Sequence, residues 1–165
     1  MKTRSLLLTG VLLAAAVLAG CSKSATTETA KKNYGHVAPH GGVLVEIGDH
    51  QFNVEFVHDE ETGKLSAYTL DAHAENFLRT AMTAFDVVVS AGGEVRTVSF
   101  KPVANTASGE TVGDTSQYDA TDPWLKDKHA FAGIIGKIDF RGTVFTDVPF
   151  RFTEAKDDDH DHEKH

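Results

Sequence analysis

The chain has 165 residues with 24 acidic and 16 basic side chains, a formal net charge of −8 with histidine neutral. This excess of negative charge repels phosphate backbones, so it argues against nucleic acid as a partner and favours cations. The length suits one domain with its own core, and the single cysteine excludes an intramolecular disulfide.

The start of the chain has the features of an export signal. Lys2 and Arg4 precede a mostly apolar run from Leu6 to Leu18, which ends in Leu18-Ala19-Gly20-Cys21. Such a run is too short for a stable spanning helix and is typical of a cleaved signal peptide. We therefore expect residues 1–20 to be a signal peptide. Its cleavage removes Lys2 and Arg4 and leaves the chain still more acidic.

The ending LAGC resembles the lipobox of bacterial lipoproteins, in which the cysteine is lipidated. We therefore expect Cys21 to be the lipidation site that anchors the protein to a membrane facing the periplasm. Ser22 follows it and, by resemblance to enterobacterial sorting, favours the outer membrane. A free thiol after an ordinary signal, or an uncleaved anchor, are the alternatives.

Two polar segments flank the expected domain. Residues 21–33 are polar and lack periodicity, which predicts a flexible tether. Residues 154–165, EAKDDDHDHEKH, contain no large apolar residue and are predicted to form a disordered tail. The folded domain is therefore expected at residues 34–153.

Apolar and polar residues alternate through this domain, and helical periodicity is almost absent. The glycine-containing turns at 48–50, 91–93 and 141–142 indicate tight connections between strands. Residues 103–122 are expected to form a loop. The expected strands are 43–47, 52–56, 65–70, 75–79 at an edge, 85–90, 94–100, 136–140 and 143–152. Seven or eight short strands predict an all-β fold, an immunoglobulin-like β-sandwich.

His36 and His40 are the first candidates for metal ligands. They lie four apart, but Pro39 disfavours the helical conformation of the residue before it, so they do not share a helix face. An extended loop followed by Gly41-Gly42 can bring two neutral imidazoles to one ion. A solvated loop with idle histidines is the alternative.

Asp71 and His73 are the second pair of candidates. Side chains at positions i and i+2 of a strand point the same way, so a carboxylate and an imidazole share one side of this strand end. Both could coordinate one ion, or Asp71 could orient His73. An ordinary polar outer face is the alternative.

The tail offers a weaker set of ligands, since imidazoles and carboxylates are mixed there without order. Its histidines are His160, His162 and His165. Such segments collect divalent ions weakly, and a solubilising acidic end is the alternative.

The available donors limit the metal. Met82 and Cys21 are the only sulfur-containing residues after the signal, and the lipid would occupy the cysteine. Imidazole with carboxylate suits divalent ions such as Zn(II) or Cu(II) rather than Cu(I). Common catalytic motifs are not found, including G-x-S-x-G, a P-loop and H-E-x-x-H, so we do not expect an enzyme.

The run PHGG-V-LVE-x-GDH, followed by Y-x-LD-x-HAEN, resembles small exported bacterial proteins and lipoproteins that carry an HGG motif. Related segments occur near the front of periplasmic adaptor subunits of heavy-metal efflux pumps. The resemblance covers about residues 38–79, with a weaker similarity at 136–152. It implies roles for His40, Gly41, Gly42, Glu46 and the segment 71–75, and efflux components as partners.

These observations predict a lipid-anchored periplasmic protein that captures or buffers Zn(II) or Cu(II), with His36, His40, Asp71 and His73 as the site. A shared site requires the two pairs of residues to be neighbours. A non-catalytic interaction module of the cell envelope with incidental histidines is the rival hypothesis. The sequence gives no indication of the oligomeric state.

Overall fold

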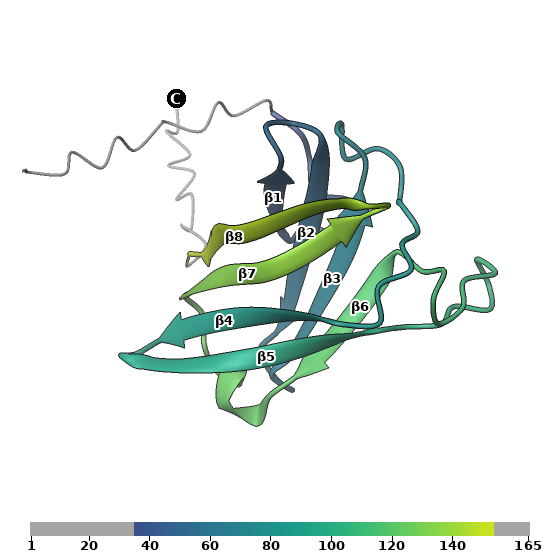
Figure 1. The fold of residues 1–165 in the computed structure, drawn as a ribbon. Coiled ribbons are helices and arrows are strands. Elements are labelled where there is room, and N and C mark those ends of the chain that lie inside the picture. Colours follow the sequence, from purple (N-terminus) through teal and green to yellow (C-terminus); the bar gives the residue numbers. More distant parts are fainter. Residues whose placement is uncertain (1–34, 154–165) are drawn as a thin grey trace, which may run out of the picture. The chain divides into compact units, whose positions relative to one another are not determined.

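The structure is a computed structural model and describes residues 35–153 (Figure 1). The expected signal, Cys21, the tether and the tail with His160, His162 and His165 lie outside the described residues. Within the described part, no helix has the length and apolar character needed to span a bilayer.

Eight strands make up nearly all of the regular structure in residues 35–153. They are β1 (Val43–Ile47), β2 (Phe52–Asp59), β3 (Lys64–Leu70), β4 (Phe85–Ala91), β5 (Glu94–Pro102), β6 (Gln117–Thr121), β7 (Phe131–Phe140) and β8 (Thr143–Phe152). One short 3₁₀ helix, η1 (Pro123–Leu125), follows β6. All neighbouring strands are antiparallel, and the order across the sheet is β1-β2-β3-β6-β5-β4-β7-β8. The prediction of an all-β fold is confirmed.

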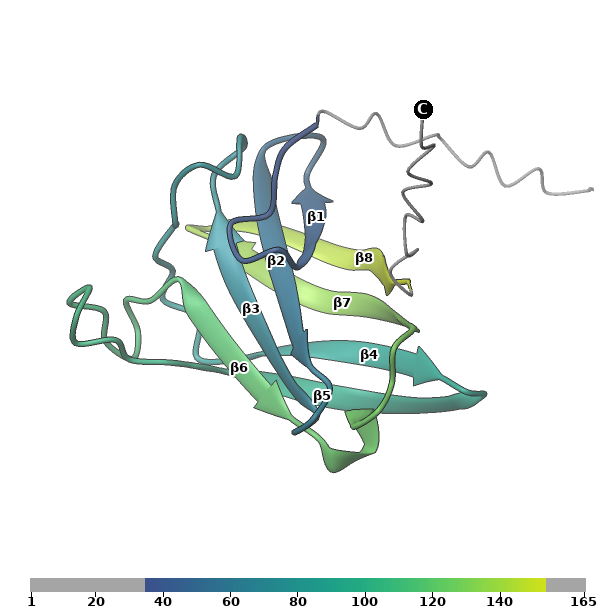
Figure 2. The same ribbon diagram turned by 180° about the vertical axis from the view of Figure 1, so that it is seen from behind.

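The sheet is a single, nearly closed barrel rather than an immunoglobulin-like pair of separate sheets. Strands β1, β2, β3 and β6 run steeply across the direction of β5, β4, β7 and β8 (Figures 1 and 2). The two halves are continuous because Lys101 and Pro102, at the end of β5, pair with Asp119 and Tyr118 of β6. Antiparallel strands that alternate in polarity suit either arrangement, and the pairing of β5 with β6 decides between them.

Aromatic side chains fill the interior. Phe56 of β2 stacks on Phe150 of β8 with ring centroids 4.2 Å apart, and Phe85 of β4 stacks on Phe100 of β5 at 4.8 Å. Phe56, Phe100 and Tyr118 are fully buried. Phe56 joins the two crossing halves, because its ring contacts both Phe150 and, edge-on at 5.6 Å, Phe100, so the core lies between them.

The ends of the sheet, β1 and β8, are close but are not joined by a ladder in the described chain. Phe145 of β8 lies against the β1–β2 turn, where its ring would meet a Cβ placed on Gly48 at 2.3 Å. Farther along β8, Asp147 has a left-handed backbone with φ of 56°, and the β7–β8 pairing skips Asp147 and Gly136, which face each other. The ladder of β8 is therefore interrupted at one point.

Most predicted strands are present, with two differences. The expected loop at residues 103–122 contains β6, and the expected edge strand at 75–79 is irregular apart from a bridge between Leu70 and Phe77. Residues 117–121 pair with β3 on one side and with the end of β5 on the other, so tertiary pairing makes a strand of a weakly patterned segment.

Candidate metal centre

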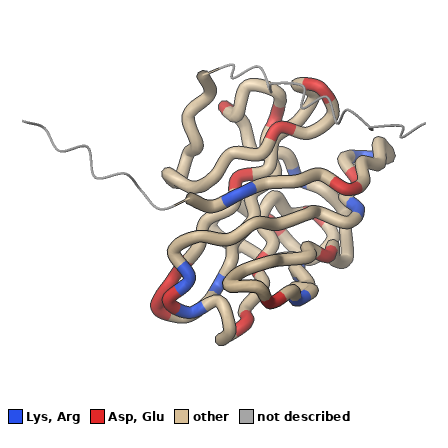
Figure 3. The backbone as a smooth tube through the Cα atoms, turned by 90° about the vertical axis from the view of Figure 1, so that its left-hand side faces the viewer, with Lys and Arg blue, Asp and Glu red and all other residues tan. Residues whose placement is uncertain are grey.

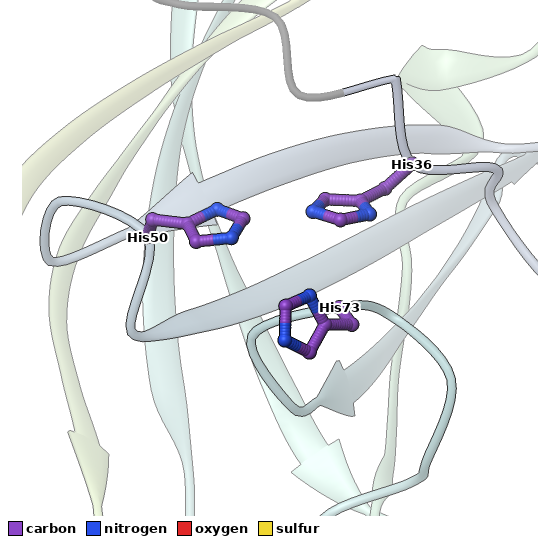
Figure 4. Close-up of side chains that lie close together, drawn as sticks. All are labelled: His36, His50 and His73. Carbon is purple, nitrogen blue, oxygen red and sulfur yellow. The ribbon is translucent and has the colours of Figure 1, made fainter.

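Three histidines from three separate segments meet at one end of the barrel (Figure 4). His36 precedes β1, His50 lies in the β1–β2 turn and His73 follows β3. Each offers a ring nitrogen, and these three nitrogens lie within 4.8 Å of one another. The rings of His36 and His50 are stacked with centroids 5.0 Å apart, and the ring of His73 stands edge-on to both at 5.5 and 5.6 Å.

The pairing of β2 with β3 explains why His50 meets His73. In this antiparallel ladder Asn53 pairs with Leu70. The same register, continued three residues beyond that pair, places His50 opposite His73. Because β2 begins where β3 ends, residues just before the one and just after the other lie at the same edge of the barrel.

The β1–β2 turn presents His50 through an unusual backbone. Asp49 and His50 both adopt left-handed φ values, 53° and 67°, and the turn is closed by the amide of Gln51, which donates to the carbonyl oxygen of Ile47 at 3.1 Å. Such conformations are uncommon outside glycine and are maintained when the surrounding structure fixes them. Here Gly48 packs against Phe145, which fixes the other side of the turn.

The loop that carries His73 is held by hydrogen bonds from both sides. The Asp71 carboxylate accepts from the amide of Glu75 at 3.0 Å and from Nδ2 of Asn76 at 2.6 Å. The Asn76 bond is the main cause that lowers the pKa of Asp71, and backbone donors including that of His73 act in the same direction. From the side of β2, Nδ2 of the buried Asn53 donates to the carbonyl oxygens of Asp71 and Ala72 at 2.8 and 2.9 Å.

His36 belongs to a segment that crosses the outer side of β2 before it turns into β1 (Figure 2). Farther along this segment, Gly41 has a φ of 72°, a conformation that glycine adopts without strain. The segment therefore reverses direction at Gly41-Gly42 and leaves His36 over the edge occupied by His50 and His73.

The three nitrogens can bind a first-row divalent ion once they move slightly closer together. Zinc–nitrogen bonds are about 2.0–2.1 Å long, so a tetrahedral ion holds its nitrogens about 3.3–3.4 Å apart. The three ring nitrogens lie within 4.8 Å of one another, so the rings must approach slightly to reach that spacing. Histidine side chains can do this by rotation about χ1 and χ2. Three imidazoles would leave a fourth position for water or another donor, so this cluster can hold a metal ion.

The surroundings of the cluster are acidic. Oε2 of Glu46 lies 4.0 Å from Nδ1 of His50, and Asp49 is the adjacent residue in the turn. A carboxylate beside a histidine favours a cation and can orient the ring. In the view of Figure 3, acidic residues are distributed over several separate parts of the backbone.

The residues predicted as ligands are divided between different places. The structure brings His36 and His73 together, whereas the Asp71 carboxylate bonds to its own loop. His40 lies away from the cluster, since its Nδ1 is 2.8 Å from Oε2 of Glu55 and its ring stacks on Tyr68 at 4.0 Å.

The sequence does not mark His50 as a candidate ligand, because a histidine beside Gly48-Asp49 is typical of an ordinary turn. One signal could have identified it. If residues 52–56 and 65–70 are neighbouring antiparallel strands, the segment before the first and the segment after the second share an edge, which makes His50 and His73 neighbours.

No protein-family model matches the sequence, and the comparisons with curated proteins and with solved structures give no significant match.

Proposed function

We propose that the protein is a lipid-anchored periplasmic metal-binding protein that captures or buffers Zn(II) or Cu(II). The observation that carries the proposal is the convergence of His36, His50 and His73 with their ring nitrogens within 4.8 Å. The three histidines come from three separate segments of the chain, and imidazole is a preferred donor for both ions.

The exposure of the cluster fits capture and release better than permanent storage. His73 is exposed, and His36 and His50 are half-buried. An ion held there would be open to water and to a partner protein on one side. The resemblance to segments of heavy-metal efflux adaptors supports a role as an accessory to such a system. The lipid anchor and the periplasmic location rest on the sequence around Cys21.

Calorimetric titration of Zn(II) and of Cu(II) tests this proposal. The parent protein for the titration is the full chain with His160→Ala, His162→Ala and His165→Ala, so that the tail cannot bind. We expect one ion per chain, with affinity at least about 100-fold weaker in each of the single variants His36→Ala, His50→Ala and His73→Ala.

His129→Ala is the matched control, since His129 is an exposed histidine that pairs with Glu60 outside the cluster. It should bind as the parent does. If the three cluster variants retain the parent affinity, the proposed site is wrong.

A further inference from the structure

The segment that carries His36 gains little from apolar burial. It takes part in no strand, and Val37 next to His36 is 82% exposed. A peptide in such a state is expected to sample many conformations unless polar contacts fix it. The position of His36 therefore depends on how the segment is attached to the barrel.

Glu55 provides the buried polar part of this attachment, beside the stacking of His40 on Tyr68 at 4.0 Å. Its carboxylate is fully buried and accepts three hydrogen bonds from the segment. The amides of His40 and Gly42 donate to Oε1 at 2.7 and 2.9 Å, and Nδ1 of His40 bonds to Oε2 at 2.8 Å. Hydrogen bonds to an ionised acceptor are the stronger kind, and a buried carboxylate needs such partners.

The close approach of the segment to β2 requires a glycine at position 42. A Cβ on Gly42 would lie 2.2 Å from the carbonyl oxygen of Phe56 and 2.9 Å from Cγ2 of Val57. Any larger residue would push the chain away from the strand that carries Glu55. The His40-Gly41-Gly42 sequence thus has a structural role, because it allows the segment to approach β2 and donate hydrogen bonds to Glu55.

We propose that Glu55 is a positioning residue of the metal centre, which holds His36 within reach of His50 and His73 through its grip on His40 and Gly42. The inference rests on the proposed metal function. The other two histidines have their own supports, since the closed β1–β2 turn presents His50 and Asn53 holds the loop of His73. Loss of the Glu55 contact should therefore turn a three-histidine site into a two-histidine site.

The test compares Glu55→Gln with His36→Ala in the full chain lacking the tail histidines. Zn(II) affinity is measured by calorimetry, and the number of nitrogens bound to Cu(II) by electron paramagnetic resonance. We expect Glu55→Gln to weaken Zn(II) binding 10- to 100-fold and to show the same loss of one nitrogen as His36→Ala. The double variant should bind no more weakly than His36→Ala alone, because both changes remove the same ligand.

Glu110→Gln is the matched control, since Glu110 is a buried carboxylate that accepts from the Ser116 amide at 3.0 Å, from its hydroxyl at 2.6 Å and from the Ser108 hydroxyl at 2.9 Å. It should lower stability and leave both metal readouts unchanged.

If Glu55→Gln is folded by circular dichroism and binds as the parent does, or if its effect adds fully to that of His36→Ala, the inference is wrong. Should Glu55→Gln fail to fold, Gly42→Ala is measured in the same way, with the same two outcomes. Parent-like binding by all three cluster variants would instead refute the proposed site itself, and absence of binding by the parent would refute the metal function.

Discussion

Asn53 and Glu55 point to the same side of β2, away from the core, and both are buried, with 2% and 0% of their surfaces exposed. Each is covered by one of the segments that deliver a histidine to the cluster. Asn53 holds the loop of His73, and Glu55 holds the segment of His36. The outer face of β2 is therefore the scaffold on which the candidate metal centre is assembled.

The contact of Asn53 can be tested by Asn53→Ala. The carbonyl oxygens of Asp71 and Ala72 lose their donor, so we expect the free energy of unfolding to fall by about 1–3 kcal/mol in urea denaturation. Zn(II) affinity measured by calorimetry should fall about 10-fold, because the loop of His73 loses its support.

Thr69→Val serves as the comparison for Asn53→Ala. Oγ1 of the buried Thr69 donates to the carbonyl oxygens of Leu78 and Ser116, and it makes no bond to residues 71–73. Thr69→Val should lower the free energy of unfolding while Zn(II) affinity stays at the parent value. Equal metal affinity in Asn53→Ala and Thr69→Val would show that Asn53 has no special connection to the site.

Metal binding should stabilise the fold. An ion that binds only the folded protein adds about 2.7 kcal/mol to the free energy of unfolding at a concentration 100 times its Kd. We expect Zn(II) to raise the thermal midpoint of the chain without tail histidines, and a chelator to reverse the effect. His50→Ala should abolish the shift. A shift of the same size in that variant would place the bound ion elsewhere.

The pair formed by His40 and Glu55 also makes a prediction about stability. His40→Ala leaves a buried carboxylate without its imidazole partner, and we expect a loss of about 1–3 kcal/mol. The loss is smaller than for a fully buried ion pair, because the side chain of His40 is 39% exposed. Adding Glu55→Gln to His40→Ala should recover part of the loss, since it removes the unpaired charge. Urea denaturation of the single and double variants measures this, and additive losses would contradict it.

His58 predicts a dependence of stability on pH. Burial among Phe131 and Phe152 lowers the pKa of its ring below the ordinary value of 6.5. The unfolded chain therefore binds the proton more readily than the folded one. The stability that neutral His58 contributes is complete above 6.5 and declines as the pH falls from there towards the lower, folded pKa.

The measurement is the free energy of unfolding in urea between pH 7.5 and pH 5, with a chelator present. His58→Phe should show a shallower decline than the parent below pH 6.5, by at most about 1.4 kcal/mol per pH unit. His73→Ala, which removes an exposed histidine in a different part of the barrel, provides the reference. An identical slope in the parent and in His58→Phe would show that His58 titrates normally.

Much of the fold could be predicted from the alternation of apolar and polar residues. The bounds expected for β1 and β8 agree with the structure, and most other strands differ by a few residues at their ends. Strand β6 could not be predicted in this way, because the segment QYDAT is short and its strand character comes from pairing on both sides. The single barrel depends on that same strand.

The site was harder to predict, for a physical reason. In β2, Asn53 and Glu55 occupy the positions of a solvent-facing side, so their pattern predicts exposure. They are buried because other segments fold over them, and sequence periodicity along one strand contains no information about such covering. The same covering draws His40 to Glu55 and places His36, four residues earlier, against His50. Local spacing therefore identified His36 and His73 but not their partner.

The interrupted ladder at Asp147 has a consequence for the behaviour of the protein at high concentration. β8 ends the sheet, and a long, straight strand in this position is a template on which another chain can add by main-chain hydrogen bonds. The left-handed residue in its middle breaks the regular spacing of donors and acceptors along that edge. Aggregation through strand addition is thereby disfavoured, so the barrel can remain open between β1 and β8 without recruiting a second copy.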